Sequence, residues 1–319
     1  MNLKIDKYSK KYEDQVVDCL QRNYSWMTAL NKHKVIEWCH PIFTYRWYDD
    51  ISEQEFLYKY GAVMLLKQRV VGFFGKFISR RYEDYNRKPY IQHNGTTWCI
   101  DKEFRFGLYD LMKLFYTGQG MFYEVTAIQS MEELYTSVYG FTYANKEKYR
   151  FFPVPFQGES SLSIEVIDDS GQMDDDILQL DYRDHIPFGV KCIKVCAGVE
   201  KGYVFYRLVH ANGTWVRILK IVNQDLISNN VHEVFWKIQQ TEQFNDCITN
   251  EIAQSKISSK AEKGEWVRLE CDKSFLNEVL IRHPQYDIRP APRLILNKCE
   301  GIKPCNDLLY TELAIMDFG

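Results

Sequence analysis

Two segments in the first half of the chain have apolar residues that recur with a helical period. Each has four such residues at positions i, i+3, i+4 and i+7: Leu108, Leu111, Met112 and Phe115 in one, and Met131, Leu134, Tyr135 and Val138 in the other. This spacing places four side chains on one face of an α-helix. Glycine commonly ends a helix, and Gly118 and Gly140 follow the two segments. The pattern predicts two amphipathic helices.

Short apolar runs bounded by turn residues predict strands. In the first half they cover residues 3–8, 61–66, 70–81, 96–101, 121–127 and 141–152, with a further helix over 11–22. In the second half they cover residues 189–196, 202–210, 214–222, 266–271 and 308–316, with helices over 176–184 and 230–240. Strands followed by a helix recur in both halves. This order predicts an α/β (α+β) fold of two mixed-sheet units in tandem, the second divergent.

A change of composition marks a boundary near the middle of the chain. Pro153 and Pro155 end the last predicted strand of the first half, and a polar run over residues 157–161 follows. Proline and clusters of small polar residues favour a linker over regular structure. We therefore expect one domain over residues 1–156 and another over residues 157–319.

Composition restricts the classes of function. Hydrophobic residues make up 45% of the 319 residues, enough for sizeable cores. The 40 Lys and Arg residues against 43 Asp and Glu residues give a net charge of −3, so a dedicated nucleic-acid binder is not expected. The apolar runs are far shorter than the roughly 20 residues that span a bilayer, and the N-terminus lacks the apolar stretch of a leader. We expect a cytoplasmic protein with no membrane span.

Nine cysteines raise the question of a metal site. Cys192 and Cys196 lie four residues apart in a predicted strand, which separates them by about 13 Å, too far to bind one ion. Cys299 and Cys305 have no second pair to complete a site of four ligands. The acidic run over residues 174–176 is expected to complement the N-terminus of the helix that follows. We therefore expect free thiols and no metal.

Three segments between residues 61 and 152 form a characteristic series. They are a hairpin, GAVMLL-KQR-VVGFF; a strand, loop and helix, TTWCIDKEFRFGLYDLMKLF; and YEVTAIQSMEELYTSVYGFTYANKEKYRFF, a strand, a short helix ending in Tyr-Gly-Phe and a final strand. The series resembles the acetyl-CoA-dependent N-acetyltransferases of the GNAT superfamily. The second half is similar in the order of its elements only. Tandem acyltransferases with two such units occur in that superfamily.

The resemblance implies that acetyl-CoA or another acyl-CoA is the co-substrate and that no metal takes part. It places this co-substrate on a strand end and the loop after it: Trp98, Cys99, Ile100, Asp101, Arg105, Phe106, Gly107 and Leu108. A helix N-terminus offers unpaired amides and a partial positive charge, which suit a diphosphate. The loop keeps one glycine of the family's motif, one position early, and Asp110 would repel a phosphate beside it. The alternative is an ordinary turn in which Gly107 relieves backbone strain.

The resemblance also implies a base for the substrate amine and an acid for the departing thiolate. Glu124, in an otherwise apolar strand, is the candidate base, and Tyr135 on the short helix is the candidate acid. His93 is a weaker candidate for the base. A carboxylate is more often solvated, and Tyr135 shares an apolar stripe, so an exposed Glu124 and a core Tyr135 are the alternatives. Aromatic residues between Tyr24 and Tyr48 are expected to cover substrate or to form core.

These observations favour an acyl-CoA-dependent N-acyltransferase that transfers an acetyl group to a small-molecule amine. An amino sugar and a cell-envelope precursor are the acceptors that the resemblance suggests. One alternative is a catalytically degenerate binding protein. It is favoured by the shifted glycine and by the position of Tyr135, which lies five residues before Gly140, whereas the family's tyrosine lies four residues before that glycine. Another is an aminoacyl-tRNA-dependent transferase, which the net negative charge disfavours. The acceptor, the acyl length and the oligomeric state are left open by the sequence.

Overall fold

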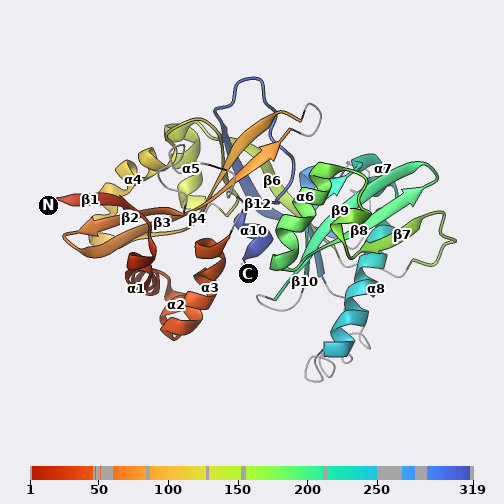
Figure 1. Ribbon diagram of the computed structural model, residues 1–319, viewed down its shortest axis with the longest axis horizontal. Helices are drawn as coiled ribbons and strands as arrows, with labels where there is room; N and C mark the ends of the chain where they lie inside the picture. Colours follow the sequence, from red (N-terminus) through yellow and green to blue (C-terminus); the bar gives the residue numbers. More distant parts are fainter. Residues whose placement is uncertain are drawn as a thin grey trace. The chain divides into compact units, whose positions relative to one another are not determined.

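The computed structural model of the chain describes residues 2–45, 47, 51, 60–83, 87–126, 129–151, 156–210, 215–249, 268–276 and 286–316. It divides into two compact units (Figure 1). Unit 1 comprises residues 1–144, 293–305 and 310–312, and unit 2 comprises residues 145–292, 306–309 and 313–319. Both are built from helices on a mixed sheet, as the sequence predicts. The expected domain boundary after residue 156 stays a prediction, and residues 152–155 beside it lie outside the described part.

Unit 1 contains a sheet with the strand order β1-β2-β3-β4-β5-β12. Its strands are β1 (Leu3–Lys7), β2 (Gly61–Leu66), β3 (Arg69–Tyr82), β4 (Pro89–Ile100), β5 (Met121–Glu124) and the end of β12 (Tyr286–Asn297). Its helices are α1 (Glu13–Asn23), α2 (Ser25–Thr28), α3 (Lys32–Thr44), α4 (Leu108–Phe115) and α5 (Gln129–Tyr139), with 3-10 turns η1 (Lys10–Tyr12) and η2 (Lys102–Gly107). β4 and β5 are parallel, and the other neighbours with a printed register are antiparallel.

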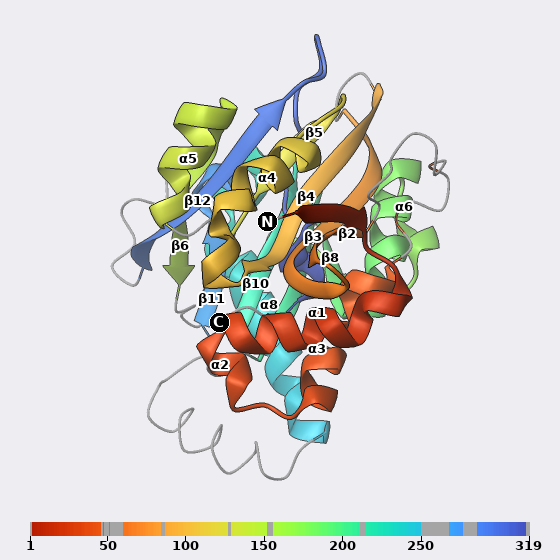
Figure 2. The same ribbon diagram turned by 90° about the vertical axis from the view of Figure 1, so that its left-hand side faces the viewer.

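Helices cover both faces of the unit 1 sheet (Figure 2). On one face, Phe74 packs into a core with Leu111, Met112 and Phe115 of α4, as the periodicity of that helix predicts. On the other face, Phe73 contacts the rings of Tyr8 and Phe43. Successive side chains of β3 thus pack into the two cores in turn, as expected for a strand that is buried on both faces.

The α5 stripe is buried only in part. Met131 and Tyr135 are buried, but Val138 is 51% exposed. The expectation that all four residues of the stripe face the core is therefore wrong for Val138. It lies in the last turn of the helix, one residue before its end at Tyr139.

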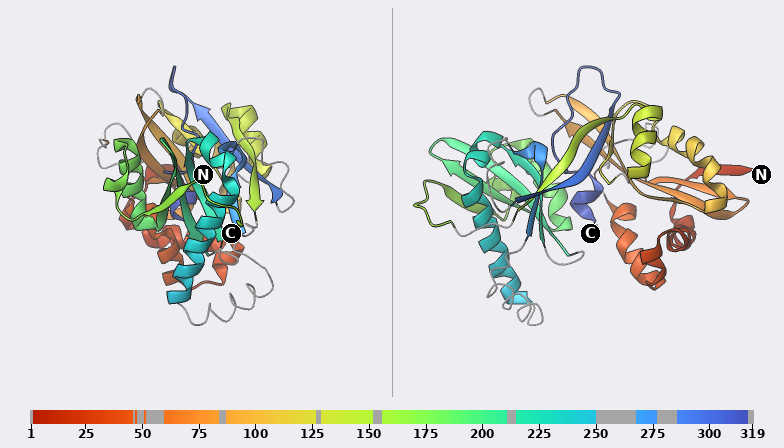
Figure 3. Two further views of the ribbon diagram at one scale, coloured as in Figure 1. Left: turned by 90° about the vertical axis from the view of Figure 1, so that its right-hand side faces the viewer. Right: turned by 180° about the vertical axis from the view of Figure 1, so that it is seen from behind.

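Unit 2 has the strand order β6-β11-β10-β9-β8-β7. Its elements are β6 (Thr142–Phe151), β7 (Ser163–Ile167), η3 (Ser170–Gln172), α6 (Asp176–His185), η4 (Ile186–Phe188), β8 (Val190–Ala197), β9 (Glu200–Val209), β10 (Trp215–Val222), α7 (Gln224–Asn229), α8 (Val231–Thr249), β11 (Arg268–Asp272), η5 (Lys273–Phe275) and α10 (Glu312–Ile315). Figure 3 shows α6 in green and the long α8 in cyan with these strands. Here β10 and β11 form the parallel pair. Asp175 caps α6 through the amides of Ile177 and Leu178, which confirms the predicted role of the acidic run.

Two sequence-based strand assignments need correction. Residues 308–316 were expected to form a strand, but Glu312–Ile315 form the short helix α10. A brief apolar run fits either structure, so its period does not decide between them. Residues 293–297 were not expected to be a strand, yet they belong to β12 and pair antiparallel with β5.

In the described part of the chain, no helix is long and apolar enough to cross a membrane.

Candidate functional site

The parallel strands β4 and β5 pair over only three residues each, Gln92–Asn94 with Met121–Tyr123. The buried side chain of Asn94 reaches across and donates to the Tyr123 carbonyl oxygen at 3.0 Å. β4 then continues for six residues beyond this pairing, to Ile100. The predicted co-substrate residues of β4, from Trp98 to Ile100, lie in this unpaired continuation of the strand.

β4 is irregular just beyond that point. Its register with β3 shifts between Phe73 and Gly75, so that Thr97 and Trp98 lie opposite Phe74. Thr97 has a φ of +46°, which is rare for a β-branched residue. Such bulges redirect a strand and occur often beside active sites, where backbone strain is retained.

Glu124, the candidate base, is the last residue of β5 and is buried. Its carboxylate lies over Gly95 of β4: a Cβ atom on Gly95 would come within 2.3 Å of Glu124 Oε1. Tyr116, directly after α4, donates its hydroxyl to the same oxygen at 2.5 Å. The solvated alternative for Glu124 is therefore wrong, and glycine at position 95 makes room for the carboxylate.

Tyr135, the candidate acid, lies beside this pair. Its ring centroid is 6.2 Å from that of Tyr116, and the side chain is fully buried. Burial, the Glu124 carboxylate and Tyr135 together raise the pKa of Tyr116 well above its ordinary value. We call Glu124, Tyr116 and Tyr135 the carboxylate–tyrosine cluster. The structure thus brings the two predicted catalytic residues together through a third.

Sequence reasoning missed Tyr116, although a signal for it exists. Tyr116 stands at i+8 from Leu108 and so continues the apolar stripe of the α4 segment. It was not selected because it falls after the last residue of the periodic pattern. A tyrosine that ends an apolar stripe brings a hydroxyl into the core, and that hydroxyl needs a polar partner.

Lys76 of β3 is a second functional candidate that sequence reasoning missed. It is directly opposite Gly95, and its side chain is 4% exposed. The Nζ atom lies 4.8 Å from the centroid of the Phe115 ring. Burial lowers the pKa of Lys76 to about 7. The signal in the sequence is a single lysine within the run of apolar and small residues from Val70 to Ser79.

We expect Lys76→Met to stabilise the protein below neutral pH. The folded-state pKa lies below the ordinary 10.5, so the unfolded chain binds more protons between about pH 7 and 10.5. The burial penalty is therefore largest below pH 7 and is relieved as pH rises. At about 1.4 kcal/mol per pKa unit, the variant should gain a few kcal/mol at pH 6 and progressively less toward pH 10. Urea unfolding across this range measures the difference. The exposed Lys113→Met is the control, and a gain independent of pH would contradict the assignment.

His93, the weaker base candidate, is buried in the same unit. Its ring stacks on Phe122 with centroids 4.4 Å apart, and its Nε2 is 3.4 Å from the Gln119 carbonyl oxygen. Burial and the Lys76 ammonium lower its pKa well below the ordinary value.

Within the described residues, no group of three or more His, Cys, Asp or Glu side chains is placed to hold a metal ion.

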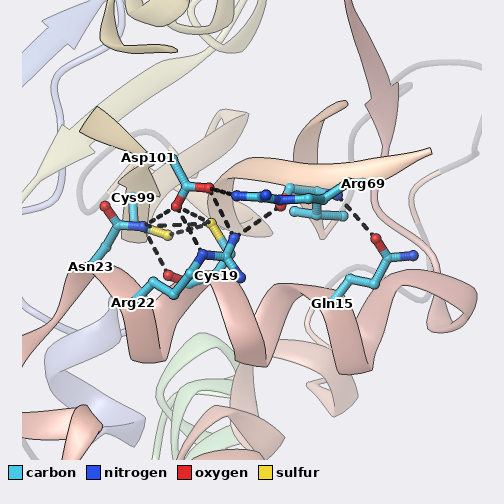
Figure 4. Close-up of polar contacts among 8 residues, drawn as sticks. Gln15, Cys19, Arg22, Asn23, Arg69, Cys99 and Asp101 are labelled. Atoms are coloured by element: carbon cyan, nitrogen blue, oxygen red, sulfur yellow. Dashed lines mark hydrogen bonds and ion pairs between the residues drawn. The ribbon is translucent and has the colours of Figure 1, made fainter. Parts of the chain in front are cut away.

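Asp101, a predicted co-substrate residue, has its carboxylate bound by the protein (Figure 4). Arg22 Nη2 and Arg69 Nη2 donate to Oδ2 at 3.0 and 2.9 Å, and Asn23 Nδ2 donates to Oδ1 at 2.8 Å. Burial would raise the pKa of Asp101, but these donors outweigh it and lower that pKa below the ordinary 3.8. Asp101 thereby ties α1 and the start of β3 to the end of β4.

The other predicted strand residues are largely committed to packing. Cys99 and Ile100 are buried, and the Cys99 sulfur is 3.5 Å from that of Cys19 on α1. Trp98 is half-buried, and its carbonyl oxygen accepts from the Tyr24 hydroxyl at 2.6 Å. This segment fixes the position of β4 against its neighbouring helices.

The predicted diphosphate loop forms the 3-10 turn η2 and the start of α4. Arg105 and Phe106 are exposed, and Leu108 is half-buried with its amide donating to the Arg105 carbonyl oxygen. Gly107 has an ordinary helical φ of −81°. A Cβ atom there would meet Met64 Cε at 2.8 Å, so the glycine admits a core side chain. A role of residues 105–108 in binding acyl-CoA stays a prediction.

The aromatic segment divides between core and surface. Tyr45 is buried, and its hydroxyl accepts from the Ile78 amide at 2.8 Å. Trp26 is 49% exposed and meets the edge of Trp38, with centroids 5.2 Å apart. Tyr48 lies outside the described residues.

Unit 2 has a counterpart of the carboxylate site. The register of β10 with β9 also shifts, after Ile218, so Arg217 holds the place that Gly95 holds before the shift in β4. Glu270 of β11 pairs with Arg217 of β10, and Glu124 and Gly95 are the residues that directly follow the last printed pair of β5 and β4. Glu270 is buried and accepts from Lys148 at 2.6 Å and from Arg150 at 3.0 Å. Its charge is therefore neutralised by two cations.

No family model and no curated protein sequence matches the chain. In structure it is similar to solved GNAT acetyltransferases. A GCN5-related N-acetyltransferase from Anabaena variabilis matches with a TM-score of 0.49 and 13% identity, over 92% of this chain and 72% of that chain. Another from Kribbella flavida has a TM-score of 0.49 and 12% identity, over 92% and 70%. Saccharomyces cerevisiae N-myristoyltransferase has a TM-score of 0.40 and 9% identity, over 92% and 79%. At these identities no residue role is transferred.

Proposed function

We propose that this chain is an acyl-CoA-dependent N-acyltransferase whose chemistry takes place in unit 1. One observation carries the proposal: the buried Glu124 carboxylate occupies the space beside Gly95, where the parallel strands β4 and β5 stop pairing and β4 bulges at Thr97. A carboxylate at the end of a strand pair can act on a substrate held between the strands. Acetyl transfer to an amine is the reaction that the family resemblance favours.

The reaction needs two proton transfers. The amine nitrogen bonds to the thioester carbonyl carbon, the carbon–sulfur bond breaks, and the amine proton passes to Glu124. The departing thiolate takes a proton from a tyrosine hydroxyl. Tyr116 carries its hydroxyl proton at neutral pH, as tyrosine ordinarily does, and its hydrogen bond to Glu124 offers a route between the two groups. Tyr135, beside it, is the second donor candidate.

Unit 1 is the better candidate for the chemistry. Its carboxylate has a glycine beside it and a tyrosine as a hydrogen-bond donor. In unit 2, Arg217 stands in place of the glycine, and Glu270 is neutralised by Lys148 and Arg150. A carboxylate in a buried ion network is a poor base because its ionised form is stabilised.

A catalytically degenerate binding protein is the second candidate. It is favoured by the loop after β4, where Gly107 faces Met64 and the Leu108 amide is already bonded. The two candidates differ in their response to a thioester and an amine. A transferase releases free thiol in the presence of both, whereas a binding protein does not.

We expect acetyl-CoA to raise the thermal stability of the protein. At a concentration about a hundred times the dissociation constant, ligand linkage adds about 2.7 kcal/mol. Calorimetry with acetyl-CoA tests binding, and thiol release with a panel of amino sugars, amino acids and simple amines tests transfer. A shift without thiol release for any amine supports the binding protein. The absence of both, with acetyl-CoA and with longer acyl-CoAs, would overturn the transferase and leave a protein that binds a different ligand or partner.

A further inference from the structure

Lys76 is a buried cation beside the candidate site without a carboxylate partner among the described residues. Its ammonium contacts the face of the Phe115 ring, and its side chain is 4% exposed. Removing a charged ammonium from water is costly unless an opposite charge compensates for it. The protein retains this lysine where methionine or leucine would pack more favourably.

Lys220, the other buried lysine in the described part of the chain, has the expected compensation. Its ammonium is 2.9 Å from Asp181 Oδ2 and 3.5 Å from Asp307 Oδ2. Both carboxylates are buried. Among the described residues, Lys76 therefore differs from Lys220 in having no carboxylate partner for its ammonium.

The position of Lys76 suggests which partner compensates the charge of its ammonium. Lys76 on β3 and Gly95 on β4 are directly opposite, so their side-chain directions share one face of the sheet. The Glu124 carboxylate lies over that same side of Gly95. The side chain of Lys76 and the carboxylate of Glu124 thus lie on the same face of the sheet beside Gly95.

We propose that the acceptor is an amino acid, with its carboxylate bound by Lys76 and its amine facing Glu124. The inference rests on the proposed function and names the substrate class of that site. A molecule with an amine and a carboxylate separated by one carbon presents a positive and a negative end, which matches the two charges beside Gly95. The apolar Phe115 ring next to Lys76 excludes water and strengthens such an ion pair.

The experiment compares acceptors that differ only in the carboxylate. Thiol release from acetyl-CoA is measured with L-amino acids and with the corresponding amino acid amides, which keep the amine and lose the negative charge. The interaction of the acceptor carboxylate with Lys76, a hydrogen bond between charged groups, should make kcat/KM for the amino acid about tenfold or more higher than for its amide. Lys76→Met should remove this preference, so that an amino acid and its amide are used with similar kcat/KM. The exposed Lys113→Met should keep the preference.

The outcomes separate this inference from the function on which it rests. Transfer to amines without a preference for the amino acid in the wild type overturns the inference and leaves the transferase. A preference that survives in Lys76→Met also overturns it. The absence of thiol release with every amine contradicts the transferase itself. A wild-type thermal shift with amino acids, absent with their amides, supports the site even if the variant does not fold.

Discussion

Glu124→Gln should reduce kcat/KM for acyl transfer by about 100-fold or more, the usual contribution of a positioned base. The amide has the size of the carboxylate and can still accept from the Tyr116 hydroxyl, so the packing of the site is retained. It cannot take the amine proton. Steady-state kinetics with acetyl-CoA and the best amine measure the loss, and calorimetry should show unchanged acetyl-CoA binding.

Two further variants control this prediction. Glu133→Gln makes the same substitution at an exposed position of α5 and should leave kcat/KM within about twofold. Gly95→Ala keeps Glu124 but places a Cβ atom where its carboxylate lies, 2.3 Å from Oε1, so it should also lower kcat/KM. A Glu124→Gln enzyme with wild-type kinetics would exclude Glu124 as the base and leave Tyr116 and Tyr135 without their proposed partner.

Asp101→Ala should lower the melting temperature by about 2–12 °C at neutral pH. Removing an acceptor of charged hydrogen bonds costs about 1–3 kcal/mol, because the arginine partners are partly exposed to water, and each kcal/mol shifts the melting temperature of a domain of this size by about 2–4 °C. Arg22, Asn23 and Arg69 lose their shared acceptor. Scanning calorimetry measures the shift, and the exposed Asp110→Ala is the matched control.

The effect of Asp101→Ala should depend on pH in a defined direction. The folded-state pKa of Asp101 is depressed below 3.8. Its stabilisation is therefore fully present above pH 3.8 and is lost as pH falls through the folded-state pKa. The difference between wild type and variant should shrink in that acidic range. A difference that is constant down to pH 2 would show that Asp101 acts through packing alone.

Local patterns in the sequence predicted much of unit 1. The stripe from Leu108 to Phe115 predicted α4, and the apolar runs around 67–69 predicted the hairpin of β2 and β3. These elements depend on residues that are close together in the sequence. The period of the apolar residues, about 3.6 for a helix and 2 for a strand, is therefore sufficient to predict them. The resemblance of residues 61–152 to a known family supplied Glu124 and Tyr135 as candidates.

What depends on contacts between distant residues was not predictable in the same way. The Glu124–Tyr116 hydrogen bond and the position of Lys76 opposite Gly95 arise from the sheet register. The ion pairs of the Asp101 carboxylate with Arg22 and Arg69 join residues that are far apart in the sequence. The proximity of Gly107 to Met64 likewise follows from the fold and not from the local motif, and the predicted co-substrate roles of both residues stay predictions.

The pairing of β5 with residues 294–297 has a consequence for biosynthesis. The strand segment that covers the outer edge of β5 is translated long after β5, so the nascent N-terminal half leaves the ribosome with an open sheet edge. Exposed edges readily recruit other strands, and connections this distant form slowly. A fragment ending near residue 156 would keep that edge permanently, so any fragment of unit 1 made for biochemical work should include residues 294–297.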